Sequence, residues 1–318
     1  MKTRSCRYTF CLMVSLLVSL WLWSCQQAPE LKQQPDNCRI VKDITGNVCI
    51  PSNSQKIVTL WETHLASALA LDVKPIASVI NYGDFPEYIQ KKAQRLQGLG
   101  AEPNLEKILL LKPDLIISSS RLQHIHPMLS KIAPTVMLYQ PRPPLTWQGN
   151  LETVASILGK EKEANQVIEN YERRIENLKA ALGESRLTTQ VSVATVTQTY
   201  GIYSYGSRPT IGMILNDLGF QRPPSQQGDF FSKEHISGEN LFDIDGDILF
   251  LSYSNDEASK KLFESLQQNP LWQKLNVVQK NRVYIVDSAH WYSFNALAAN
   301  AILDDLEKYL VDERGGKK

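Results

Sequence analysis

The chain has 318 residues, of which 43% are hydrophobic and 21% are charged, a composition typical of a folded protein with one or two cores. Its formal net charge is +1, and it becomes −2, from 31 basic and 33 acidic residues, if Lys2, Arg4 and Arg7 leave with a signal segment. A near-neutral chain without a basic stripe argues against nucleic acid as a partner.

The N-terminus has the pattern of a secretory signal segment, with three basic residues before an apolar run at residues 10–23. The run ends in Leu-Trp-Ser-Cys, which resembles the lipobox of bacterial lipoproteins, and the resemblance implies that Cys25 is lipidated. We therefore expect a signal peptide at 1–24 and a lipid-anchored polar tether at 25–37. The alternative is an uncleaved anchor, for which the run is short against a hydrocarbon core of about 30 Å. Both interpretations place the folded part outside the cytoplasm, on the periplasmic side or at the cell surface, and tether it to the membrane.

Only two cysteines, Cys38 and Cys49, lie beyond the signal segment and its cleavage site. Between them, two short segments flank a turn-like Asp-Ile-Thr-Gly at 43–46, a pattern that predicts a small hairpin. The hairpin would place Cys38 opposite Cys49 and allow a structural disulfide, worth roughly 2–3 kcal/mol in the chain-entropy model. Two cysteines without nearby histidines argue against a zinc site.

Residues 147–183 have the pattern of a long connecting helix. Apolar residues recur at spacings of three and four up to Gly159, which is expected to end or kink a first helix. A second apolar stripe continues to Leu182, and this part would span roughly 35 Å. We interpret the segment as a stiff strut between an N-terminal lobe at 38–146 and a C-terminal lobe at 184–318. An ordinary packing helix inside one large α/β domain is the alternative.

The N-terminal lobe alternates strand and helix patterns. Strands are predicted at 56–61, 73–79, 114–118 and 135–138, and helices at 63–71 and 105–111, the second capped by Asn104. This alternation predicts a parallel sheet covered by helices, in which ligands bind beyond the carboxyl ends of the strands. The residues that follow the strands therefore matter most, namely Trp61, the segment 118–121 with Arg121, and the segment 139–142.

Several stretches of this lobe form recognisable motifs: Gly-Leu-Gly-Ala-Glu-Pro-Asn-Leu-Glu-Lys-Ile at 98–108, Leu-Lys-Pro-Asp-Leu-Ile-Ile at 111–117 and Ile-Ala-Pro-Thr-Val at 132–136. They resemble substrate-binding proteins of ABC importers for ferric siderophores, haem and cobalamin, the class III periplasmic binding proteins. The likeness covers roughly residues 56–310. It implies an α/β fold of two Rossmann-like lobes with mostly parallel sheets, joined by one long rigid α-helix, with the ligand cleft between the lobes. Such a helix resists bending, so we expect little closure on ligand.

The C-terminal lobe continues the alternation. Strands are predicted at 190–197, 247–251 and 282–286, and residues 202–205 continue as strand or turn. A helix is predicted at 210–218, and Gly219 ends it. A polar loop at 226–231 contains Phe230 and Phe231, and Asn-Pro-Leu-Trp at 269–272 also matches the family's pattern. The last helix is expected to begin at Trp291 and Tyr292 and to end near Leu310.

Ferric siderophores present apolar and amide surfaces around an oxygen-ligated iron and are often anionic. The resemblance therefore implies flat aromatic walls and forked arginine donors, without a protein metal site or a cofactor. The loops after the strands supply eight candidate ligand-binding residues: Trp61, Arg121, Tyr205, Arg208, Phe230, Phe231, Trp291 and Tyr292. We expect one aromatic of each adjacent pair to pack inward, and Trp147 and Trp272 to be core. Arg208 could equally pair with a carboxylate, and Trp61 could end its strand in the core.

Two carboxylates are expected to serve a separate purpose. By resemblance, Glu106 and Glu239 occupy the positions that dock onto arginines of the membrane permease, one in each lobe. The alternative for either one is a solvated glutamate favoured by the helix dipole. The chain departs from hydroxamate-siderophore binders at Gly100, where they carry an arginine, so the class of siderophore stays open. The expected partners are a ferric siderophore, an ABC permease and the membrane, with the protein acting as a monomer.

Other functions fit less well. Haem, cobalamin or a free metal ion is the alternative ligand, but His64, His124, His126 and His290 form no evident cluster, and alternate histidines on a helix point apart. An enzyme is the alternative class, for which the sequence offers no nucleophile elbow, phosphate loop or dinucleotide fingerprint. We expect a binding protein without catalytic residues.

Overall fold

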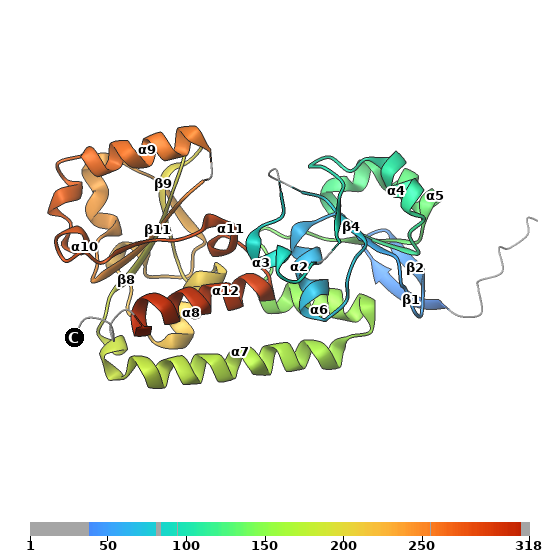
Figure 1. The fold of residues 1–318 in the computed structure, drawn as a ribbon, viewed down its shortest axis with the longest axis horizontal. Coiled ribbons are helices and arrows are strands. Elements are labelled where there is room, and N and C mark those ends of the chain that lie inside the picture. Colours follow the sequence, from blue (N-terminus) through green and yellow to red (C-terminus); the bar gives the residue numbers. More distant parts are fainter. Residues whose placement is uncertain (1–37, 81–83, 94, 255, 313–318) are drawn as a thin grey trace, which may run out of the picture. The chain divides into compact units, whose positions relative to one another are not determined.

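The computed structural model describes residues 38–80, 84–93, 95–254 and 256–312 (Figure 1). The predicted signal peptide, Cys25 and the tether lie outside these residues. The described residues from Arg39 onward belong to one compact unit. Among the described residues, no helix is both long and apolar enough to cross a membrane.

The predicted hairpin is confirmed. Strands β1 (Cys38–Asp43) and β2 (Gly46–Pro51) form a two-stranded sheet, and both Cys38 and Cys49 are disulfide-bonded. The Asp43 carboxylate closes the turn by accepting hydrogen bonds from the backbone N–H groups of Thr45 (2.7 Å) and Gly46 (3.1 Å). Asp is favoured at such turns because its side chain can bond to the backbone two residues on.

The first five-stranded sheet is wholly parallel, as predicted, in the order β5-β4-β3-β6-β7. Its strands are β3 (Ile57–Thr59), β4 (Ala77–Ser78), β5 (Gln97–Gly98), β6 (Leu115–Ser119) and β7 (Thr135–Leu138). Its helices are α2 (Glu62–Ala70), α3 (Glu87–Gln90), α4 (Leu105–Leu111), η1 (Ser120–Ile125) and α5 (His126–Ile132). Every residue of β3 and β6 is buried, because helices cover both faces of the sheet (Figure 1).

Two predictions for this lobe, the bounds of one helix and of one strand, can be compared with the structure. Helix α4 has the predicted bounds, and the Asn104 side chain caps it by accepting a bond from the Lys107 N–H at 2.9 Å. The strand predicted at 73–79 is reduced to the two residues of β4, because Pro75 has no N–H to give to a sheet.

The connecting segment is two helices, α6 (Trp147–Leu158) and α7 (Glu161–Leu182), separated at Gly159, whose φ of 66° is left-handed. The expected single long helix is therefore α7 alone, with 22 residues and a length of about 33 Å. Apolar residues of α6 and α7 share one buried cluster with Ala68 and Leu71 from the N-terminal half and with α8 and α12 from the C-terminal half. The helices are thus packed into a common core along their apolar sides.

The second five-stranded sheet has the order β10-β9-β8-β11-β12. Its strands are β8 (Val191–Thr197), β9 (Gly201–Tyr205), β10 (Ser232–Ile236), β11 (Ile248–Tyr253) and β12 (Val283–Ile285). Strands β8, β10, β11 and β12 run in one direction, and β9 runs against them, pairing antiparallel with both β8 and β10. The fold is therefore α/β with two mostly parallel sheets, as expected.

Helices surround this second sheet and complete the chain. They are η2 (Glu184–Leu187), α8 (Thr210–Leu218), η3 (Pro224–Gln226), η4 (Gly238–Ile244), α9 (Glu257–Gln268), η5 (Trp272–Lys274), α10 (Asn276–Gln279), α11 (Ser288–Trp291), α12 (Ala296–Glu307) and η6 (Lys308–Asp312). The expected start of the last helix at Trp291 is wrong. Trp291 ends the short α11, and α12 begins after Asn295, whose side chain accepts the N–H of Ala298 at 2.9 Å.

Candidate ligand-binding site

In the N-terminal half, Trp61 and Arg121 lie against each other. Trp61 follows β3 and begins α2, and Arg121 follows the neighbouring parallel strand β6, so both stand at the same edge of the sheet. The guanidinium carbon of Arg121 lies 4.8 Å from the centroid of the Trp61 ring. This is a cation–π contact, worth about 0.5–1 kcal/mol at an exposed site. It holds an exposed cation in a fixed place beside a flat ring.

In the C-terminal half, aromatic rings gather around Tyr292, which is 48% exposed. The ring centroids of four residues lie 6.0–6.3 Å from that of Tyr292: Tyr203, Tyr205, Phe231 and Phe294. Tyr203 and Phe294 were not among the predicted site residues. The position of Tyr203 could have been inferred, because residues 203 and 205 of one strand share a face.

Arg208 makes a two-pronged ion pair with Asp229. Its Nε lies 2.8 Å from Oδ1 and its Nη2 lies 2.8 Å from Oδ2. The guanidinium holds the pKa of the Asp229 carboxyl below its usual value, and the carboxylate raises the pKa of Arg208. The alternative that Arg208 pairs with a carboxylate is therefore confirmed, and an anionic ligand must compete with Asp229 for the guanidinium.

A close backbone approach accompanies this ion pair. The Arg208 N–H donates to the carbonyl oxygen of Phe230 at 3.2 Å. A Cβ on Gly206 would lie 2.4 Å from that same oxygen, so no larger residue fits there without a backbone shift. The loop that leads into α8 is thereby fixed to the loop that precedes β10.

Two predicted site residues are buried, which corrects the expectation that their side chains face a ligand. Tyr205 is 1% exposed, and its hydroxyl hydrogen-bonds Thr195 at 2.9 Å. Trp291 is 2% exposed, and its Nε1 donates to Asp305 at 2.7 Å. Each buried polar atom has a partner inside the lobe, so both side chains are held inward.

The other aromatic expectations have mixed outcomes. Of the pair Trp291 and Tyr292, one packs inward, as predicted. Phe230 and Phe231 are both only partly buried, so the expectation that one of them is core is wrong. Trp147 and Trp272 are core residues, at 0% and 4% exposure.

Tyr88 contacts a residue next to Trp61 and a residue next to Tyr292. The Tyr88 hydroxyl from α3 donates to Glu62 at 2.9 Å, and its oxygen lies 3.4 Å from the hydroxyl oxygen of Ser293. Glu62 follows Trp61 in the chain, and Ser293 follows Tyr292. Convergence of the two groups on a single groove stays a prediction.

Three of the histidines, His64, His126 and His290, are buried or hydrogen-bonded within the fold. Among the described residues, no group of three or more histidine, cysteine or acidic side chains could hold a metal ion. Burial alone would lower the pKa of His290, but hydrogen bonds to Asp287 and Asp305 and the charges of both carboxylates raise it to about 9. Burial lowers the pKa of His64 to about 3, so that ring is neutral. His126 bonds to Ser130 at 3.2 Å.

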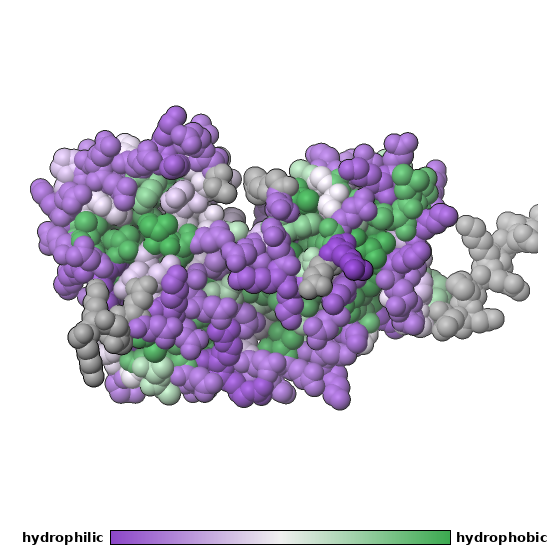
Figure 2. All heavy atoms as spheres, viewed as in Figure 1, coloured by the Kyte–Doolittle hydropathy of each residue, from purple (hydrophilic) through white to green (hydrophobic). Residues whose placement is uncertain are grey.

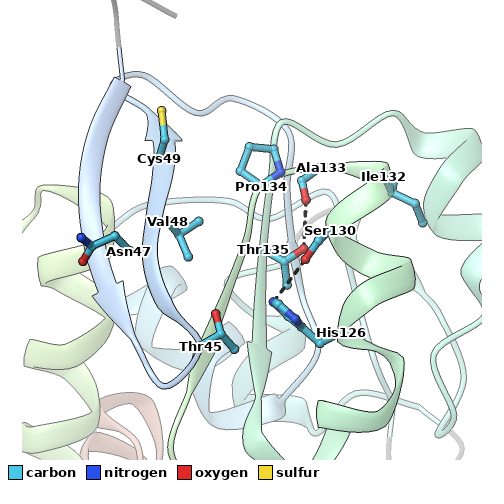
Figure 3. Close-up of a pocket in the computed structure, with 10 residues that line it drawn as sticks. All are labelled: Thr45, Asn47, Val48, Cys49, His126, Ser130, Ile132, Ala133, Pro134 and Thr135. Carbon is cyan, nitrogen blue, oxygen red and sulfur yellow. Dashed lines mark hydrogen bonds between the residues drawn. The ribbon is translucent and has the colours of Figure 1, made fainter. Parts of the chain in front are cut away.

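Two cavities are lined by none of the eight predicted ligand-binding residues. One of about 510 Å³ lies between the hairpin and the segment from α5 to β7, and Figure 3 shows its lining side chains, including His126 with Ser130 and Thr135 with Ala133. The other, of about 400 Å³, lies beside α8. The first contains none of the predicted site residues, and its lining holds a single ionisable group, His126.

Glu106 and Glu239 have matching surroundings. Each is exposed in the first turn of a helix, α4 and η4 respectively. Large apolar side chains are exposed one turn further on: Leu109 (57%) and Leu110 (78%) after Glu106, and Phe242 (53%) after Glu239. Figure 2 shows hydrophobic surface in the area of α4 and α5.

Two mostly parallel sheets, helices packed against both, and exposed arginine and aromatic groups beyond the strand ends together define a two-lobed α/β binding protein. The chain belongs to the periplasmic binding protein family, whose model matches residues 57–289.

Among its relatives is the probable siderophore-binding lipoprotein YfiY of Bacillus subtilis, 32% identical over 94% of this chain and 97% of the relative. The achromobactin-binding periplasmic protein of Dickeya dadantii is 32% identical over 80% of this chain and 86% of its own. Among solved structures, Staphylococcus aureus SirA complexed with staphyloferrin B has a TM-score of 0.71, with 27% identity, 86% of this chain and 98% of that chain covered.

Proposed function

We propose that this protein captures a ferric siderophore outside the cytoplasm and delivers it to an ABC permease for iron uptake. The Arg121 guanidinium stacked on Trp61 carries the proposal. A ferric siderophore arrives with its iron already ligated by oxygens, so its receptor needs a forked donor and a flat wall. The names of the relatives, siderophore-binding and achromobactin-binding, and the staphyloferrin B complex of the similar structure support this ligand class.

Within the proposed site, the accessible predicted residues contact the ligand. They are Trp61, Arg121, Arg208, Phe230, Phe231 and Tyr292. Tyr205 and Trp291 support this surface from behind, since the Tyr205 ring packs against Tyr292. The division into lobes at 38–146 and 184–318 is part of the same proposal, with the ligand bound between them.

The second part of the proposal concerns delivery. Glu106 and Glu239 form ion pairs with arginines of the permease, one for each half of the protein. The exposed Leu109, Leu110 and Phe242 support this role, because apolar area beside each carboxylate adds affinity that salt does not screen. Lipidation of Cys25 keeps the monomeric protein near the permease, and the lipoprotein name of the Bacillus relative supports this anchor.

Isothermal titration of the protein without residues 1–25 tests ligand capture. Ferric citrate, a ferric hydroxamate and a ferric catecholate are titrated, each beside its iron-free chelator, with haem and cobalamin as further ligands. We expect saturable binding of at least one ferric complex and none of its iron-free form. If no ferric siderophore binds, or if haem or cobalamin binds instead, the proposed ligand is wrong.

Uptake of radioactive iron by cells tests delivery. The variant Glu106→Ala with Glu239→Ala should lose uptake while its affinity for the ferric complex is unchanged. The matched control is Glu172→Ala, an exposed glutamate on α7. Loss of ligand affinity in the double variant would contradict a docking role.

A further inference from the structure

Arg222 is a buried cation that forms no ion pair within the described part of the chain. Its side chain is 6% exposed, and its Nη2 donates to the carbonyl oxygen of Tyr205 at 2.9 Å and to Oε1 of Gln226 at 2.5 Å. Its Nε and Nη1 have no hydrogen-bond partner in the described part of the chain. Buried donors are nearly always paired, so two buried, unpaired nitrogens on one guanidinium call for an acceptor.

Of the ion pairs found among residues 38–80, 84–93, 95–254 and 256–312, none includes Arg222. Burial lowers its pKa to about 10, which still leaves the guanidinium charged at neutral pH. A buried charge without a partner is costly, and an anion from solution would remove that cost.

A cavity of about 400 Å³ lies where such an anion could bind. Its lining comprises Ser207, Asn216, Phe220, Gln221, Arg222, Gln226, Gln227, Gly228 and Asp229. The amides of Asn216, Gln221 and Gln227 bring further N–H donors to the wall. The single carboxylate in the lining, Asp229, is already paired with Arg208.

We propose that this cavity binds a small oxyanion, either a tetrahedral anion such as phosphate or sulfate or a simple carboxylate, with Arg222 as its cationic partner. None of the residues proposed to contact the siderophore lines this cavity, and the two regions adjoin at Asp229, which lines the cavity and pairs with Arg208. The Gln227 side chain donates to the Arg222 carbonyl at 2.9 Å, so an anion here also stabilises the loop that carries Asp229.

Inorganic phosphate, sulfate and acetate are the probes. Each is titrated into the protein without residues 1–25 at constant ionic strength, and binding is followed by the melting temperature and by calorimetry. We expect a saturable rise in melting temperature with at least one anion. The relative affinities of phosphate, sulfate and acetate show whether the site prefers a tetrahedral anion or a carboxylate.

Arg222→Met should weaken this binding by about tenfold or more, since it removes charged donors from the cavity. Asn216→Asp, at an exposed lining position, should weaken it as well by adding a negative charge, and it tests the site if Arg222→Met does not fold. Arg173→Met, an exposed arginine on α7, should leave binding unchanged. The proposal is overturned if no anion binds saturably, or if Asn216→Asp and Arg222→Met bind as tightly as the unaltered protein.

Discussion

Replacement of Arg121 by Met should weaken binding of the ferric siderophore by roughly 10- to 150-fold. A hydrogen bond to a charged group contributes about 1.5–3 kcal/mol, and each 1.4 kcal/mol is a tenfold change in Kd. Arg121 lies 4.8 Å from the Trp61 centroid, inside the roughly 6 Å limit for a cation–π contact. The donor is thus already oriented before ligand arrives, so little of its contribution is lost to ordering.

Two further variants separate charge from geometry. Arg121→Lys keeps the charge without the planar fork, so its Kd should fall between those of the unaltered protein and Arg121→Met. Trp61→Ala removes the ring that orients Arg121. The double variant, Arg121→Met with Trp61→Ala, completes a double-mutant cycle. The two residues should then show a coupling of about 0.5–1 kcal/mol in the free energy of ligand binding.

Calorimetry with the ferric complex measures each Kd, and urea unfolding of the ligand-free variants checks that each is folded. A Kd for Arg121→Met within about twofold of the unaltered protein, a difference below roughly 0.5 kcal/mol, would show that this guanidinium does not contact the ligand.

Four other predictions concern groups around the site and the core. Asp229→Asn frees Arg208 from its carboxylate and should tighten binding of an anionic ferric complex, by about fivefold or less, as measured by calorimetry; weaker binding would contradict competition. Stability should fall as pH rises from about 6.5 to about 9, because the folded state holds the proton of His290 more tightly than the unfolded state, and His290→Gln should flatten this limb. His64 has the opposite effect: its pKa is lower in the folded state, so the free energy of unfolding should fall as pH falls below about 6.5. His64→Leu should therefore resist acid unfolding better, and an acid transition equal to that of the unaltered protein would refute this. Trp147→Ala should cost about 3–5 kcal/mol in urea unfolding, since the ring is fully buried; a cost near zero would mean that this core is not shared by the helices.

The predictions that succeeded rest on chemistry within a few residues. The bounds of α4 follow from Asn104 and from the residues before Pro113, and the break at Gly159 follows from the freedom of glycine to adopt a positive φ. Strand β10 escaped prediction because its sequence, Ser-Lys-Glu-His-Ile, has no apolar alternation and pairs only with β9.

Burial of the site residues could not be predicted in the same way. Trp291 and Tyr292 are adjacent and both aromatic, yet one is 2% exposed and the other 48%. The difference arises because Asp305, fourteen residues later, accepts the indole N–H. Likewise, Arg208 and Asp229 are 21 residues apart, and nothing in either local sequence indicates that they pair.

The amino-acid sequence by itself determined the α/β class, the long helix α7, and the motifs of a periplasmic binding protein, because periodicity, caps and motifs are properties of neighbouring residues. Only the tertiary structure decided which aromatic rings remain accessible, which carboxylate Arg208 binds, and that Arg222 is buried beside a cavity. The reason is physical: exposure and pairing depend on the elements that pack against a residue from distant parts of the chain.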